Sequence, residues 1–202
     1  MRRIALLALL CVAVAAGADK DKDHFAPKPA ASYPGHQTSE KITVAAVPYT
    51  REDEVKAAFG KVDPYKYGIL PILVIIQNDT GKALRLNLKT ELVDLQNNRA
   101  DPMKASDVTL VDGSRKASYK VPQPPILPIP TTKLHHGPLD TWQIEGHAFT
   151  AKLLPIGEQV YGFFYFDQEL RAGSHLYVDG ISDAETGKGY FYFEVPFEDQ
   201  KP

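Results

Sequence analysis

The chain has 202 residues, of which 44% are hydrophobic and 24% are charged, a composition typical of a single globular domain. Its 23 Lys and Arg residues nearly balance its 25 Asp and Glu residues, so it lacks the general positive field of a nucleic-acid-binding protein. The 16 Pro and 14 Gly residues argue against a helical bundle, because both residue types interrupt helices.

The first 18 residues have the pattern of a signal peptide. Two arginines precede an uncharged apolar run over residues 4–16, and Ala16 and Ala18 are the small residues that a signal peptidase requires. An uncleaved anchor is the disfavoured alternative, because the run is shorter than a membrane-spanning helix. We therefore expect cleavage near Ala18, no transmembrane span in the mature chain, and a periplasmic or cell-surface location in a bacterium.

Cys11 is the only cysteine and lies within the predicted signal peptide. The mature chain then has neither a disulfide nor a thiolate for catalysis or metal binding. Residues 19–40 are polar and contain several prolines, which predicts a flexible polar tether. Residues 41–202 are predicted to form one β-sandwich domain.

Apolar and alternating segments predict strands in the first half of this domain. The candidates are 41–47, the almost wholly apolar 69–77, 84–89 and 91–96. A short helix is predicted over residues 50–60, with Val55, Ala58 and Phe59 on one face. The turn residues at 78–81 predict a hairpin between two of the strands.

Residues 101–157 are predicted to be an irregular, proline-rich insertion with a short helix around Trp142. The segment VPQPPILPIP at 121–130 contains five prolines and is expected to be extended outside any sheet. Three further strands are predicted at 160–166, 175–181 and 189–197. Strands separated by turn residues at such intervals indicate an antiparallel sandwich.

Two stretches of the chain carry a resemblance to a known module. AFGKVDPYKYGILPILVIIQN, with the alternating leucines after it, resembles the beginning of an immunoglobulin-like module of uncharacterised exported bacterial proteins. LLPIGEQVYGFFYFD and LYVDGISDAETGKGYFYFEV are similar to the closing strands of that module. The likeness covers residues 41–100 and 150–197. It implies an all-β, antiparallel immunoglobulin-like β-sandwich, and it implies no activity.

The last strands are unusually aromatic. Alternation along a strand predicts that one face of each carries several rings. These rings, if they share one sheet, form a platform for a sugar ring, a peptide or a partner protein, and they are Tyr161, Phe163, Tyr165, Tyr190 and Tyr192. The favoured alternative is that the proline-rich segment, helped by Trp142, covers this face as a second core, because large exposed apolar patches are rare.

Catalytic and metal-binding motifs give weaker signals. The sequence contains no G-x-S-x-G, H-E-x-x-H or P-loop motif. His135, His136 and His147, with a carboxylate such as Asp140, are candidate ligands for Cu, Zn or Ni. Their spacing matches no known ligand motif, so exposed loop histidines are the favoured interpretation.

Together these patterns predict an exported, non-catalytic binding or structural module of the bacterial envelope. The expected partner is an envelope protein or a polysaccharide, and no cofactor is expected. The alternative is a periplasmic metal-binding protein that uses the histidines of residues 135–147.

Overall fold

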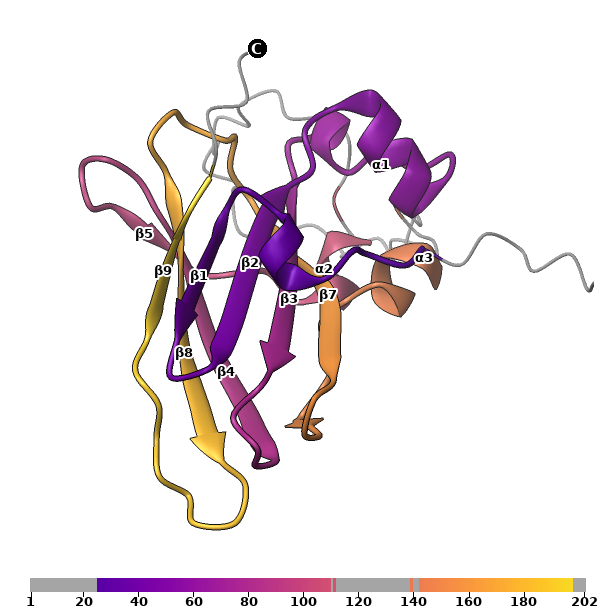
Figure 1. Ribbon diagram of the computed structural model, residues 1–202. Helices are drawn as coiled ribbons and strands as arrows, with labels where there is room; N and C mark the ends of the chain where they lie inside the picture. The colour runs from indigo at the N-terminus through magenta and orange to yellow at the C-terminus, as the bar shows by residue number, and fades with distance from the viewer. Residues whose placement is uncertain (1–24, 110, 112–138, 140–141, 198–202) are drawn as a thin grey trace, which may run out of the picture.

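Two antiparallel sheets face each other in the computed structural model, which describes residues 25–109, 111, 139 and 142–197 (Figure 1). The first sheet has the order β1–β2–β3–β7, and the second has the order β5–β4–β8–β9 with β6 beside β4. The strands are β1 (His36–Ser39), β2 (Ile42–Pro48), β3 (Leu70–Asn78), β4 (Leu84–Val93), β5 (Arg99–Ala100), β6 (Leu153–Leu154), β7 (Gln159–Phe166), β8 (His175–Asp183) and β9 (Phe193–Pro196). The predicted all-β sandwich is confirmed.

Short helices occupy one side of this sandwich. They are η1 (Ala30–Ser32), α1 (Glu52–Phe59), η2 (Tyr65–Tyr67), α2 (Ala105–Val108) and α3 (Trp142–Gly146). The predicted helices around Val55 and Trp142 are confirmed as α1 and α3. Of the predicted insertion at 101–157, the structure describes α2, α3 and β6, while its proline-rich part at 121–130 lies outside the described residues.

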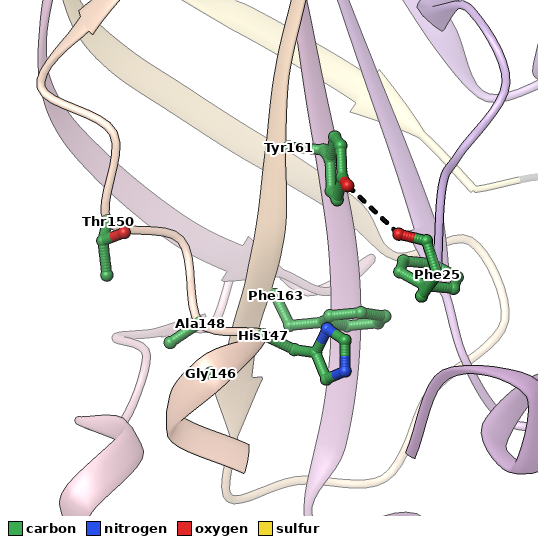
Figure 2. A pocket seen from close by; sticks show the side chains of 7 residues that line it. All are labelled: Phe25, Gly146, His147, Ala148, Thr150, Tyr161 and Phe163. Atoms are coloured by element: carbon green, nitrogen blue, oxygen red, sulfur yellow. Dashed lines mark hydrogen bonds between the residues drawn. The ribbon is translucent and has the colours of Figure 1, made fainter. Parts of the chain in front are cut away.

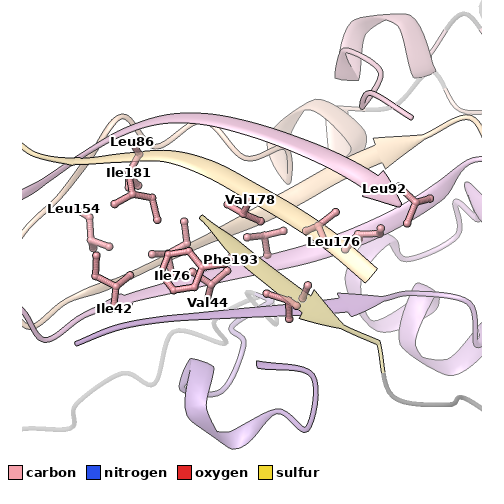
Figure 3. Packing of buried hydrophobic residues seen from close by; sticks show 14 of the residues in the cluster. Ile42, Val44, Ile76, Leu86, Leu92, Leu154, Leu176, Val178, Ile181 and Phe193 are labelled. Carbon is pink, nitrogen blue, oxygen red and sulfur yellow. The ribbon is translucent and has the colours of Figure 1, made fainter. Parts of the chain in front are cut away.

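The inner core fills the space between the sheets (Figure 3). Alternate residues of each strand point into it. From the first sheet come Ile42, Val44, Ile72, Val74 and Ile76, and from the second come Leu86, Leu92, Leu176, Val178, Ile181 and Phe193. Burying each of these side chains contributes roughly 1.5–3 kcal/mol, so this core is the main source of stability.

The first sheet is also buried on its outer face, the face turned away from the second sheet. Leu73 and Ile75 of β3 pack there in a second cluster with Phe59 of α1 and Ile144 of α3. In Figure 1 the helices lie on this side of the first sheet. Burial on both faces explains why β3 is a continuous apolar run with no polar alternation.

Residues 25–40 belong to the sandwich. Ala30 is buried against the outer face, and His36–Ser39 pairs with β2 as an edge strand. The predicted tether over 19–40 is therefore wrong for residues 25–40, whereas 19–24 and the predicted signal peptide lie outside the described residues. The polar sequence of β1 fits its place at the edge, where side chains stay partly or fully exposed.

The turn after β3 connects the two sheets. β3 pairs with β2 and β7, whereas β4 pairs with β5, β6 and β8. The predicted hairpin at 78–81 is therefore wrong, although the turn itself is present. Turn residues indicate that the chain reverses, but they do not determine whether the next strand joins the same sheet.

Asn78 ties this turn to β6. Its side chain is fully buried, and its Nδ2 donates hydrogen bonds to the carbonyl oxygens of Lys82, Leu154 and Pro155 at 2.7, 3.2 and 2.9 Å. Its Oδ1 accepts from the backbone N–H and the hydroxyl of Thr80. One amide thus satisfies polar groups from three segments of the chain.

We predict that Asn78→Asp destabilises the protein by about 3 kcal/mol or more, because a buried carboxylate cannot donate to three carbonyl oxygens. Urea unfolding at pH 7 measures this loss. Asp79→Asn in the same turn is the control, and at this exposed site we expect a change within about 0.5 kcal/mol. Equal stability of the two variants would contradict the role of Asn78.

Candidate functional site

A cavity of about 340 Å³ opens on the outer face of the first sheet, beside β7 (Figure 2). We call it the aromatic cavity, and its lining residues are Phe25, Gly146, His147, Ala148, Thr150, Tyr161 and Phe163. Three separate segments meet here: the beginning of the described chain, the segment after α3, and β7. Its volume lies within the range of small-ligand pockets.

Backbone pairing places His147 at the cavity. The N–H of Phe163 donates to the carbonyl oxygen of His147 at 2.8 Å, and the N–H of Phe149 donates to the carbonyl oxygen of Phe163 at 3.0 Å. Gly162 permits this approach, because a Cβ there would lie 2.5 Å from the Cα of Phe149. The position of His147 therefore depends on the edge of β7 and not on its own side chain.

The imidazole of His147 is packed among aromatic rings. The ring centroids of Phe25, Phe59 and Phe163 lie 5.7, 5.8 and 6.3 Å from that of His147, and all three rings are nearly perpendicular to it. Burial lowers the pKa of His147 below its usual value, because the charged form loses hydration. At neutral pH one ring nitrogen is therefore a donor and the other an acceptor.

Phe25 forms one wall of the aromatic cavity. Its ring contacts those of Tyr49, Tyr161 and Phe163 at centroid distances of 6.1, 6.2 and 5.6 Å. Its carbonyl oxygen accepts a hydrogen bond from the Tyr161 hydroxyl at 3.1 Å, drawn as the dashed line in Figure 2. Phe25 was not predicted as a site residue. The one signal in the sequence that could have identified it is that it is a single aromatic residue in a polar segment.

The five predicted aromatic residues do not form one platform. Tyr161, Phe163 and Tyr165 lie on the outer face of the first sheet, whereas Tyr190 and Tyr192 lie in the loop between β8 and β9, where Tyr190 packs against the inner core. The prediction of one shared surface is therefore wrong. The physical reason is twofold: the predicted strand at 189–197 is β9 at Phe193–Pro196 only, and alternation along a strand does not show which sheet that strand joins.

Most of the outer face is covered. Phe163 and Tyr165 are 2% and 1% exposed, while Tyr161 at the cavity is 41% exposed. The buried Tyr165 hydroxyl donates to the carbonyl oxygen of Ile144 at 2.7 Å, and burial raises its pKa. The described cover consists of Phe25 and the helices, and the predicted cover at 121–130 lies outside the described residues.

Trp142 does not have the burying role that we expected. It is 78% exposed, and its ring lies beside the cavity, since a Cβ at Gly146 would be 3.6 Å from its Cε3 atom. An exposed tryptophan next to an aromatic concavity is typical of a binding surface. Sequence analysis named the residue but assigned it the opposite role.

The predicted metal ligands are only partly described. His147 lies in the aromatic cavity, whereas His135, His136 and Asp140 lie outside the described residues. Within the described ranges, no group of three His, Cys, Asp or Glu side chains is arranged to hold a metal ion. The structure instead brings His147 together with Tyr161 and Phe163, which sequence analysis had assigned to a different site.

The aromatic cavity offers few groups for chemistry. The described lining residues provide one imidazole, the hydroxyls of Thr150 and Tyr161, and no carboxylate or thiol. Acid–base or nucleophilic catalysis needs a second converging group that activates the first. The accessible lining combines polar atoms with the rings of Phe25 and Tyr161, which suits a group that has an apolar part and one or two hydrogen-bonding atoms.

Comparison with protein-family models, curated proteins and solved structures finds no match to this chain. Among the described residues, no helix has the length and apolar character needed to cross a bilayer. The case for function therefore depends on the geometry of the cavity.

The lowered pKa of His147 predicts a pH-dependent stability. As pH falls below the usual value of 6.5, the unfolded chain takes up a proton that the folded chain still excludes, so the free energy of unfolding falls. This contribution is fully present above about pH 6.5 and is lost as pH falls towards the folded pKa. Urea unfolding at pH 7 and pH 5 measures it.

We expect His147→Gln to lose this part of the pH dependence. The control is His175→Gln, on β8 of the second sheet, which should retain it. Equal losses of unfolding free energy in His147→Gln and wild type between pH 7 and pH 5 would contradict a buried imidazole at this position.

Proposed function

We propose that the protein is an exported, non-catalytic binding module of the bacterial envelope, which holds an apolar group of an envelope protein in the aromatic cavity. The observation that carries this proposal is the concave site itself, with aromatic walls around an uncharged imidazole. The signal peptide and the immunoglobulin-like type of the sandwich belong to the same proposal, supported by the sequence patterns.

The walls of the cavity suit a partner's apolar side chain. The rings of Phe25 and Tyr161 offer contact area without the entropy cost of ordering long flexible side chains, and the buried Phe163 supports them from below. The imidazole of His147 and the hydroxyl of Thr150 offer directional hydrogen bonds that fix the orientation of the bound group. The exposed ring of Trp142 extends the contact surface beyond the cavity.

A polysaccharide is the less favoured partner. Sugar rings stack on free aromatic faces, and the exposed Tyr192 lies on the second sheet, stacked on Tyr177 at 5.2 Å. The guanidinium of Arg99 lies over the Tyr177 ring at 5.3 Å. The rings of Tyr177 and Tyr192 are therefore already engaged within the protein, while the exposed Phe191 and Trp142 come from different elements, the segment before β9 and α3.

The alternative function is periplasmic metal binding. An uncharged His147 is competent as a ligand for Cu or Zn, but aromatic rings surround it on three sides. Metal analysis of the purified mature protein separates the two functions. Stoichiometric Cu or Zn that is lost in His147→Ala would favour the alternative and contradict the proposed function.

Site-specific photocrosslinking tests the proposed function. A benzophenone amino acid in place of Thr150 would sit at the cavity, and we expect irradiation of living cells to link it to an envelope protein. The matched position is Asn87, which is exposed on β4 of the second sheet and should give no such adduct. No adduct at position 150, or equal adducts at both positions, would contradict the proposal.

A further inference from the structure

β7 is the last strand of the first sheet, and half of its outer edge is already paired. Phe163 bonds to the segment at 147–149, and the carbonyl oxygen of Tyr165 accepts from the N–H of Met103 at 2.7 Å. Both residues therefore turn their backbone polar groups away from β3. In an antiparallel ladder this orientation alternates with every residue.

The same alternation directs the backbone groups of the first half of the edge outward, and the described residues leave that half open. β7 pairs with β3 in continuous register from Gln159 to Phe166, so Gln159 and Tyr161 also direct their N–H and C=O groups outward. Within the described part of the chain, no residue pairs with these four groups. An unpaired row of this kind is a template for another strand.

The other end of the first sheet does not offer such a row. β1 lies beside β9 of the second sheet, and the Oε1 atom of Gln37 accepts a hydrogen bond from the N–H of Glu194 at 2.7 Å. A Cβ at Gly35 would lie 2.8 Å from the carbonyl oxygen of Pro196, so the two edges are in close contact. The seam between β1 and β9 protects that side of the sandwich.

The open edge borders the aromatic cavity. Tyr161 contributes its side chain to the cavity and its backbone to the edge. In an antiparallel strand added to β7, the residue opposite Tyr161 would share its face, because paired residues point to the same side of a sheet. Its side chain would therefore enter the cavity beside Phe163 and His147 (Figure 2).

We propose that the partner binds as an extended peptide that pairs with β7 along Gln159 and Tyr161 and places a large apolar side chain in the aromatic cavity. The inference rests on the proposed function and adds the conformation of the partner. Main-chain hydrogen bonds to the edge supply affinity, and the cavity supplies selectivity for aromatic or large aliphatic residues. Trp142 lies beside the cavity and adds exposed contact area.

Gln159→Pro tests the main-chain hydrogen bonds of the edge separately from the aromatic cavity. Proline removes the outward N–H of residue 159 and preserves the ladder to β3, and edge positions of this kind tolerate proline. Gln159→Ala is the matched control, because it removes the side chain and keeps the N–H. The aromatic cavity is unchanged in both variants, and thermal unfolding checks that both are folded.

The probe is a library of random heptapeptides displayed on phage and selected on the immobilised mature protein. We expect the enriched peptides to share one aromatic or large aliphatic residue among strand-forming residues. Their affinity should fall about fivefold to tenfold for Gln159→Pro and stay within about twofold for Gln159→Ala. Replacing the shared apolar residue by Ala should weaken binding at least as much.

Failure of enrichment, or equal binding of the peptides to wild type and to Gln159→Pro, would overturn this inference. If Gln159→Pro does not fold, the test uses peptides that are N-methylated next to the shared apolar residue and so lack one main-chain N–H. Undiminished binding of those peptides would also overturn the inference. The crosslinking experiment at position 150 tests the proposed function separately. If the adduct forms there but the peptide test fails, the proposed function is retained and only the strand-pairing inference is rejected.

Discussion

Burial of the first sheet on both faces is the constraint on which the rest of the structure depends. In β3, Ile72, Val74 and Ile76 pack between the sheets, while Leu73 and Ile75 pack against the outer layer. A sheet that is covered over most of both faces meets solvent chiefly at its edges and where its cover ends. Since β1 lies against β9, the edge of β7 is where the described part of this sheet has unpaired backbone groups.

The aromatic cavity follows from the way the outer layer is assembled. Phe25, α1, α2 and α3 come from separate parts of the chain, and each covers only a part of the face. Among the described residues this cover ends near Tyr161, which keeps 41% of its surface exposed two residues from the buried Phe163. The cavity thus lies between the well-packed part of this outer layer and the edge of β7.

Periodicity predicted most of the strands and the fold class, but it did not predict their partners. The apolar run of β3 and the aromatic alternation of β7 are visible in the sequence, because burial dictates which residues face inward. Which sheet each strand joins depends on contacts between distant segments. The predicted platform failed for this reason, since Tyr161 lies in the first sheet and Tyr190 lies in a loop of the second half of the sandwich, beside β8.

Single residues outside any periodic pattern were the hardest to predict. β1 is polar because it forms an edge, and Phe25 stands alone among polar residues, so neither resembles a core segment. His147 was named as a metal ligand, whereas its surroundings in the described structure are the rings of Phe25, Phe59 and Phe163. Its role depends on three-dimensional neighbours that no local spacing encodes.

Residue-resolved amide hydrogen exchange along β7 tests the central claim most directly, because it distinguishes groups paired within the sheet from groups left open at its edge. The amides of Val160 and Gly162 face β3, and that of Phe163 bonds to His147, so all three should be strongly protected. The amides of Gln159 and Tyr161 should exchange about 100-fold faster or more. Protection of Tyr161 equal to that of Gly162 would show that the edge is covered, and would contradict the account.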